Sequence, residues 1–365
     1  MGDHPVLPDY AGACIANVVP ALLEPADTPP PWLPEPAVAA DQVVLLTLDG
    51  LGWDQLQARR HLAPTLAGMA GGPITSVAPT TTATALTSIT TGMSPGEHGV
   101  VGYRMHVAGE VLNVLRWSTA AGDARQSIPP AKIQDHEAFL GHRPPIVTRA
   151  EFRHSGFSGA HLDGTRFHGW RTTSTLVVEV RTLLRTGEPF VYAYYDGIDK
   201  VAHEYGLGEH YDAELASADR LVADLLGVLP PRGVLVVTSD HGQVHVGDAV
   251  VPIAGEVMSH TAQLSGEGRF RWLHARAGRR AALVEAAKAL HGDQAWVATR
   301  DEVAMEGWFG PRLSDAGASR LGDVVLAARD DVAFSDPHDT GPYHLVGRHG
   351  SLTRAEVLVP LLVSA

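Results

Sequence analysis

The clearest pattern along the chain is a set of continuous apolar runs that each end in an aspartate. The runs are VVLLTLD (43–49), GEPFVYAYYD (187–196) and GVLVVTSD (233–240). Apolar and polar positions do not alternate in them, which predicts strands that are buried on both faces of a parallel sheet. Two glycines directly after the first run then allow a tight turn into a helix near Asp54.

Two stretches between these runs have the spacing of helices. TSTLVVEVRTLL (173–184) precedes the second run, and residues 211–229 precede the third. In the latter, apolar residues recur at alternating steps of three and four and share one helical face: Leu215, Ala218, Val222, Leu225 and Leu229. Repeated helix–strand units predict an α/β fold, a doubly wound and mostly parallel sheet flanked by helices.

Other segments fit this pattern less well. Residues 11–23 predict a short helix interrupted near Pro20, and the proline-rich lead-in 28–36 excludes helix and central strand. Residues 104–175 are irregular and rich in Gly, Pro, His and Arg. Residues 250–335 contain a strand–helix–strand pattern. We interpret these last two segments as insertions that cap the strand ends.

Composition narrows the class of protein. The 365 residues are 45% hydrophobic and 19% charged, and we expect one catalytic domain over residues 1–365. A net charge of −13 argues against binding of extended nucleic acid, but not of a small anion held by metals. The single cysteine, Cys14, excludes an intrachain disulfide. We see no secretory leader and no apolar window of about 18 residues, so we expect a cytoplasmic location without a membrane span. The oligomeric state is left open.

Acidic residues gather at the predicted strand ends. Asp49, Asp196, Asp199 and Asp240 lie at or just beyond the carboxyl ends of the three runs. Ligands of open α/β sheets collect at that edge. Taken singly, an aspartate such as Asp49 is more simply explained as a helix cap.

A threonine-rich segment, APTTTATALTSITTG (78–92), follows the first strand. Pro79 ends the preceding element, and Thr80 to Thr91 predicts a helix with its apolar residues turned inward. Threonine is a poor residue for a helix interior. The hydroxyls either cap the helix, or one of them is a nucleophile at the helix N-terminus, where free N–H groups favour an anion.

Histidines next to carboxylates complete a set of possible metal ligands. Asp199 and His203 are four residues apart and would share a helical face, while His241 directly follows Asp240. His349 precedes a glycine near the C-terminus. Each of these is explicable alone as a structural or solvated residue. Together, three carboxylates, three imidazoles and a hydroxyl are what two tetrahedral metal sites require.

The motifs occur in an informative order. They are Asp49, then PTTT (79–82) with TG and HG by residue 99, D-x-x-x-H-x-x-G (199–206), SDHG (239–242) and HG (349–350). This series resembles the alkaline phosphatase superfamily, and most closely its nucleotide pyrophosphatase/phosphodiesterase branch. The resemblance covers Val43 to Gly350 and implies an alkaline phosphatase-like fold that hydrolyses a small phosphoester.

The resemblance also implies roles for individual residues. One metal would be held by Asp49, Asp240 and His241 with Thr82 bridging, and the second by Asp199, His203 and His349. Thr82 is the fourth residue of PTTT, where the family has its nucleophile, and Thr81 is the competitor if the alignment shifts by one. The implied mechanism is in-line attack by Thr82, giving a phosphothreonine that water hydrolyses, with the metals about 4 Å apart.

Two departures from the family pattern affect the substrate pocket. The phosphodiesterases usually have an asparagine twenty-one residues after the nucleophile, where this chain has Tyr103. A phenol can also donate one hydrogen bond, so Tyr103 is either a substrate-binding catalytic group or a packing residue. Ala83 and Thr84 replace an aromatic residue and a proline, which predicts a reshaped pocket.

Alternatives remain for the substrate and the metal. A phosphomonoesterase or phosphonate hydrolase on the same scaffold would need extra positive charge; Arg104, Arg116 and Lys132 in the first insertion could supply it, although the sequence does not place them. A non-catalytic metal-binding relative is a third possibility, although its usual sign, degraded ligands, is missing. The ligand set predicts two divalent ions, best fitted by Zn²⁺, with manganese or iron permissible.

Overall fold

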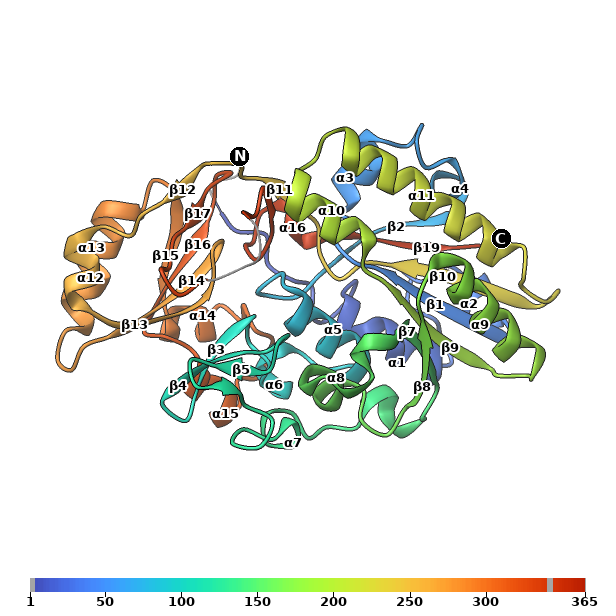
Figure 1. The fold of residues 1–365 in the computed structure, drawn as a ribbon, viewed down its shortest axis with the longest axis horizontal. Coiled ribbons are helices and arrows are strands. Elements are labelled where there is room, and N and C mark those ends of the chain that lie inside the picture. Colours follow the sequence, from blue (N-terminus) through green and yellow to red (C-terminus); the bar gives the residue numbers. More distant parts are fainter. Residues whose placement is uncertain (1–3, 340–343, 365) are drawn as a thin grey trace.

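The structure is a computed structural model that describes residues 4–339 and 344–364 (Figure 1). Its main feature is a seven-stranded sheet with strand order β2-β19-β10-β1-β9-β7-β8. The five strands from β10 to β8 are parallel, and β19 runs antiparallel to its neighbours β10 and β2. The strands are β1 (Gln42–Leu48), β2 (Ala70–Thr75), β7 (Pro145–Arg149), β8 (Arg166–Trp170), β9 (Phe190–Tyr195), β10 (Gly233–Thr238) and β19 (Leu358–Val363). The predicted mostly parallel α/β fold is confirmed.

Helices cover both faces of this sheet. In β1, Val44 and Leu46 belong to one hydrophobic cluster, and Val43 and Leu45 to another. The first cluster includes residues of α3 (Trp53–Ala58), α4 (Pro64–Gly68), α9 (Thr173–Arg185), α10 (Gly197–Tyr205) and α11 (Glu209–Leu226). The second includes residues of α1 (Val18–Leu23), α2 (Pro36–Ala39), α5 (Thr82–Thr91) and α8 (Gly156–His161). Burial on both faces explains why the strand sequences are continuously apolar.

Three helix predictions need correction. The predicted interruption near Pro20 is wrong, because a 3₁₀ turn, η1 (Ile15–Asn17), leads into α1 and places Pro20 in its first turn, where no N–H bond is lost. Helix α11 ends at Leu226 before a glycine, so Leu229 packs against the core from beyond the helix. Helix α5 begins at Thr82, two residues later than predicted.

Two smaller four-stranded sheets lie beside the main one (Figure 1). One is an antiparallel sheet of β3 (Arg104–Val107), β4 (Glu110–Asn113), β5 (Ser118–Thr119) and β6 (Gly122–Asp123). The other consists of β13 (Thr261–Glu267), β14 (Phe270–Ala275), β16 (Val324–Ala328) and β15 (Ala295–Thr299), with α12 (Gly255–His260) and α13 (Arg280–His291) packed on it. The second sheet contains the strand–helix–strand pattern of the sequence.

The segment 104–175 divides between these structures. Its first part builds the β3–β6 sheet, whereas residues 145–170 supply β7 and β8 to the main sheet. Residues 145–170 are therefore part of the main sheet. That residues 104–144 and 250–335 cap a single domain stays a prediction. Among the described residues, every helix is too short or too polar to cross a membrane.

Short elements complete the chain. They are the helices α6 (Pro95–His98), α7 (Pro130–Ile133), η2 (Ala138–Gly141), η3 (Ala150–His154), α14 (Arg300–Met305), α15 (Asp315–Arg320) and α16 (Arg354–Val357). Two strand pairs are also present: β11 (Val244–His245) with β18 (Gly347–Arg348), and β12 (Val250–Val251) with β17 (Ala333–Phe334). The pairing of β11 with β18 brings the segment before His349 next to the segment after His241.

Candidate metal centre

The motif carboxylates meet at the carboxyl ends of three adjacent parallel strands. Asp49 directly follows β1, Asp240 follows β10, and Asp199 lies in the first turn of α10 after β9. Gly50 allows this approach, because its φ is +77° and a Cβ there would lie 2.9 Å from the Asp199 Cα. The expectation that strand ends gather these residues is met by the fold.

Asp49, Asp240 and His241 form the first group of possible ligands. The Nε2 atom of His241 lies 3.4 Å from Asp49 Oδ1 and 3.3 Å from Asp240 Oδ2. Both carboxylate oxygens are buried without a hydrogen-bond partner. Each aspartate is held by its other oxygen, Asp49 through the hydroxyl of Tyr194 and Asp240 through the N–H of Gly50. Two orphaned buried oxygens that converge on one imidazole nitrogen are a fit for a cation.

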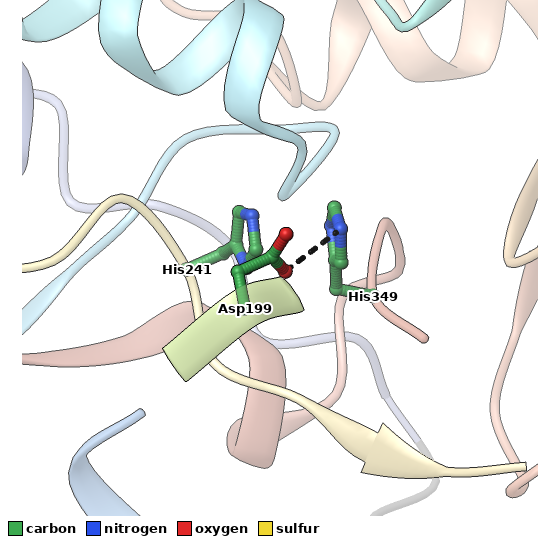
Figure 2. Close-up of side chains that lie close together, drawn as sticks. All are labelled: Asp199, His241 and His349. Carbon is green, nitrogen blue, oxygen red and sulfur yellow. Dashed lines mark ion pairs between the residues drawn. The ribbon is translucent and has the colours of Figure 1, made fainter. Parts of the chain in front are cut away.

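Asp199, His203 and His349 form the second group; Figure 2 shows Asp199 and His349 together with His241 of the first group. The Oδ1 atom of Asp199 lies 3.3 Å from His203 Nε2 and 3.7 Å from His349 Nε2. The rings of His241 and His349 stack with centroids 3.5 Å apart, so the two groups are immediate neighbours. Asp199, His241 and His349 also lie close enough to bind one ion, as do Asp49, Asp240 and His241, so His241 could serve either position.

All three histidines are oriented in the same way. Each Nδ1 atom lies against a backbone carbonyl oxygen: Gly347 O at 2.8 Å for His203, Gly242 O at 3.1 Å for His241 and Thr80 O at 2.7 Å for His349. A carbonyl cannot donate a hydrogen, so Nδ1 carries the proton and Nε2 presents its lone pair to the site. Metal-binding histidines are commonly fixed by such outer contacts.

The pKa values of two buried carboxylates and one imidazole of the site are shifted by burial and by neighbouring charges. Burial raises the pKa of Asp49, and the charges of Asp240 and Asp199 raise it further. Burial likewise raises the pKa of Asp240. Burial, together with His241 and His203, lowers the pKa of His349 well below its usual value. Divalent cations would stabilise the ionised carboxylates and the neutral imidazoles, so the residues present fit two neighbouring metal ions.

Thr82 places a hydroxyl at the edge of the first group. It is the first residue of α5, and its Oγ1 atom lies 3.2 Å from His241 Nε2, whereas Thr81 is the N-cap. Later hydroxyls in this fully buried helix, such as those of Thr87 and Thr91, donate to carbonyls four residues earlier. This local bonding accounts for the threonine density that the sequence left unexplained.

A large cavity opens onto the second group and onto Thr82 at the edge of the first. It has a volume of about 1410 Å³, and its wall includes Thr82, His203 and His349 together with Tyr103. Arg104 and Arg116 line it as well, but Lys132 lines a separate cavity of about 360 Å³. The hypothesis that Lys132 supplies charge to the substrate is therefore not supported.

The sequence analysis missed two residues that hold the ligands. The amide of Gln243 donates to Asp199 Oδ1, and the hydroxyl of Tyr194 donates to Asp49. Gln243 lies three residues after Asp240 in the same turn, which was the only signal for it. Tyr194 is part of a strand whose apolar run gave no reason to single it out.

A comparison with protein families decides the classification of the chain. The model of the type I phosphodiesterase / nucleotide pyrophosphatase family matches residues 43–352, which include every residue of both groups. The chain belongs to this family. It is a metal-dependent phosphoester hydrolase.

Solved structures similar to this member of the type I phosphodiesterase family share its fold. Murine ectonucleotide pyrophosphatase/phosphodiesterase 5 is 14% identical with a TM-score of 0.66, over 88% of each chain. Its human counterpart is 15% identical with a TM-score of 0.65, over 88% of this chain and 87% of the other. Phosphonoacetate hydrolase from Sinorhizobium meliloti 1021 is 18% identical with a TM-score of 0.65, over 89% and 90%. No curated protein matches.

Proposed function

We propose that the chain hydrolyses phosphodiester bonds in small phosphoesters, with the Thr82 hydroxyl as nucleophile and two divalent metal ions as cofactors. The observation that carries the proposal is the 3.2 Å contact between Thr82 Oγ1 and His241 Nε2, at a helix N-terminus beside two orphaned carboxylate oxygens. One ion would be held by Asp49, Asp240, His241 and Thr82, and the other by Asp199, His203 and His349. Three imidazoles and three carboxylates suit Zn²⁺.

The reaction would proceed in two displacements. The metals, when bound, supply Lewis acidity and favour the ionised hydroxyl. The Thr82 oxygen bonds to phosphorus as the ester P–O bond breaks, and the leaving alcohol takes a proton from solvent. Water then attacks the phosphothreonine, the bond to Thr82 breaks, and Thr82 regains its proton. The first N–H groups of α5 and the Tyr103 hydroxyl would hold phosphoryl oxygens through both steps.

Two solved relatives support the choice of substrate and nucleophile. Murine ectonucleotide pyrophosphatase/phosphodiesterase 5 carrying a threonine-to-alanine change is inactive and was determined in complex with AMP. The hydrolase from Sinorhizobium meliloti binds phosphonoacetate. Both ligands are small phosphorus compounds of a size that the cavity accommodates.

A monoesterase or phosphonate hydrolase is the second candidate, and Arg348 favours it. Arg104 is paired with Asp336 and Asp339, so its charge is neutralised. Arg348 lines the same cavity next to His349; among the described residues it forms no ion pair within 4.0 Å, although the charge of Asp339 acts on its guanidinium. Its recorded hydrogen bond is a donation to Leu345 O at 3.2 Å. A guanidinium that is not held in an ion pair suits a substrate with a second negative charge.

Turnover of two nitrophenyl esters by the zinc-loaded protein tests the proposal. Bis-p-nitrophenyl phosphate should be hydrolysed with a higher kcat/KM than p-nitrophenyl phosphate. A strong preference for the monoester would replace the proposed activity with the second candidate. Turnover of neither ester, by a protein that contains its metals, would point to a non-catalytic relative.

A further inference from the structure

Tyr103 and Asn113 are joined by a hydrogen bond whose direction is fixed. The Asn113 Nδ2 atom lies 2.6 Å from the Tyr103 hydroxyl oxygen. The other end of the same amide, Oδ1, lies 3.0 Å from the backbone nitrogen of Arg116. A backbone N–H can only donate, so Oδ1 must face Arg116 and the NH₂ group must face the phenol.

The direction of this bond settles what the phenol can do. A phenol has one proton, and its oxygen accepts the hydrogen of Asn113, so the proton of Tyr103 is left for another acceptor. Over residues 4–339 and 344–364 no protein acceptor is recorded for that proton. Tyr103 and Asn113 both line the large cavity, whose wall also contains Thr82.

The local fold holds the pair in place. Arg104 and Asn113 are register partners in the β3–β4 hairpin, and the Val114 N–H donates to the carbonyl of Tyr103 at 2.9 Å. The backbone of Tyr103, directly before β3, is therefore fixed opposite Val114, the residue after Asn113. A hairpin of this kind can present both side chains to the cavity without a mobile loop.

We propose that Asn113 is a positioning residue that makes Tyr103 an obligatory hydrogen-bond donor to an anionic oxygen of the substrate. Asn113 does not touch the substrate. It acts by occupying the acceptor side of the phenol, so that the phenol cannot use its proton within the protein. The inference rests on the proposed function, because it assumes that a phosphoryl group binds next to Thr82.

Asn113→Asp is the informative substitution, because it reverses the bond. A carboxylate accepts and cannot donate, so the Tyr103 hydroxyl would turn towards it and withdraw its proton from the cavity. We expect kcat/KM for bis-p-nitrophenyl phosphate to fall by about 10- to 100-fold, as in Tyr103→Phe, since a hydrogen bond to a charged group is lost. Asn113→Ala leaves the phenol free to donate, and its loss should be only a few-fold.

A double-mutant cycle separates this role from charge repulsion or damage to the fold. In a Tyr103→Phe background, Asn113→Asp should change kcat/KM by less than about twofold, because the group it acts through is gone. Ser118→Asp is the matched control. Ser118 pairs with Asn113 across β4 and β5 and lines the same cavity, so Ser118→Asp adds the same charge next to Asn113 while leaving the bond from Asn113 to the phenol in place. Its effect should be equal in both backgrounds.

The same double-mutant cycle can be measured without turnover, by calorimetry of the binding of inorganic phosphate to each variant. The same pattern, with a weaker Kd in Asn113→Asp only when Tyr103 is present, would support the inference. Additive losses in both readouts, or a loss in Asn113→Ala as large as in Asn113→Asp, would overturn it. If phosphate binding follows the cycle but no ester is hydrolysed, the proposed function fails and the inference stands.

Discussion

The Nε2 atoms of His203 and His349 lie 3.2 Å apart. Both Nδ1 atoms face backbone carbonyls, so both Nε2 atoms carry lone pairs that point at each other. This arrangement is repulsive unless a cation or a proton lies between the nitrogens. Two imidazoles bound to one tetrahedral zinc ion place their nitrogens about 3.3 Å apart, given Zn–N distances of about 2.0–2.1 Å. The separation in this chain therefore matches the value expected if His203 and His349 bind one metal, as proposed.

Metal removal should destabilise the protein, because the ion relieves this repulsion and that of the buried carboxylates. We expect dialysis against a chelator to lower Tm by several degrees, since ligand at a hundred times its Kd stabilises by about 2.7 kcal/mol per site. Added Zn²⁺ should restore Tm, and elemental analysis should find two metal ions per chain. An unchanged Tm in a metal-free protein would count against the site.

Thr82→Ala should reduce kcat by about 10⁴-fold or more, because the proposed nucleophile is lost. Thr81→Ala is the matched control, since Thr81 is the adjacent N-cap. It should retain activity within about tenfold, the scale of a lost cap and a slightly displaced helix. Mass spectrometry of the protein quenched during turnover should find the phosphate on Thr82. Normal turnover by Thr82→Ala would show that the nucleophile lies elsewhere.

Arg348→Met should discriminate between substrates. If Arg348 binds a second negative charge, kcat/KM for p-nitrophenyl phosphate should fall by roughly tenfold or more. The value for bis-p-nitrophenyl phosphate, which has one charge, should change by less than about threefold. Lys132→Met, in the separate cavity, should alter neither. Equal losses on both esters would instead assign Arg348 a structural role.

His98 should make stability depend on pH. It is buried, with its Nε2 atom 2.8 Å from Ser88 Oγ and its Nδ1 atom accepting from the Val100 N–H. Burial, followed by the charges of His136 and Arg320, lowers its pKa to about 3. The unfolded state takes up the proton at about 6.5, so it binds more protons than the folded state between these values. Stability is therefore complete above about pH 6.5 and is lost as the pH falls towards 3.

Urea unfolding of the metal-free protein at several pH values measures this effect. The contribution of His98 has a slope of up to about 1.4 kcal/mol per pH unit. In His98→Gln, which keeps a donor for Ser88 but cannot titrate, the pH dependence should be shallower by that amount. Parallel curves for the two proteins would exclude His98 as the cause.

Much of the fold followed from the sequence, because burial imposes a simple pattern. The apolar runs that form β1, β9 and β10 are buried on both faces of the sheet, and the helices α9 and α11 are amphipathic. Strands β7 and β8 were not predicted. Both are five residues long and lie in a segment dominated by irregular structure, so their membership of the main sheet depends on tertiary packing.

The candidate site was predictable to a similar degree. The proximity of Asp49 and Asp240 could be predicted from the sequence, because neighbouring parallel strands have their carboxyl ends at the same edge of a sheet. Arg348 and Asn113 could not, since neither lies in a periodic pattern. The proposed role of Asn113 depends on its hydrogen bond to Tyr103 in the β3–β4 hairpin. The proposed role of Arg348 depends on Arg104 being paired with Asp336 and Asp339.

Anomalous diffraction at the zinc absorption edge, from crystals of the zinc-loaded protein, tests the central claim most directly. We predict two peaks about 4 Å apart, one among Asp49, Asp240 and His241 and within bonding distance of Thr82 Oγ1, and the other among Asp199, His203 and His349. A single ion elsewhere, or His349 and Asp199 turned away from the second position, would contradict the account.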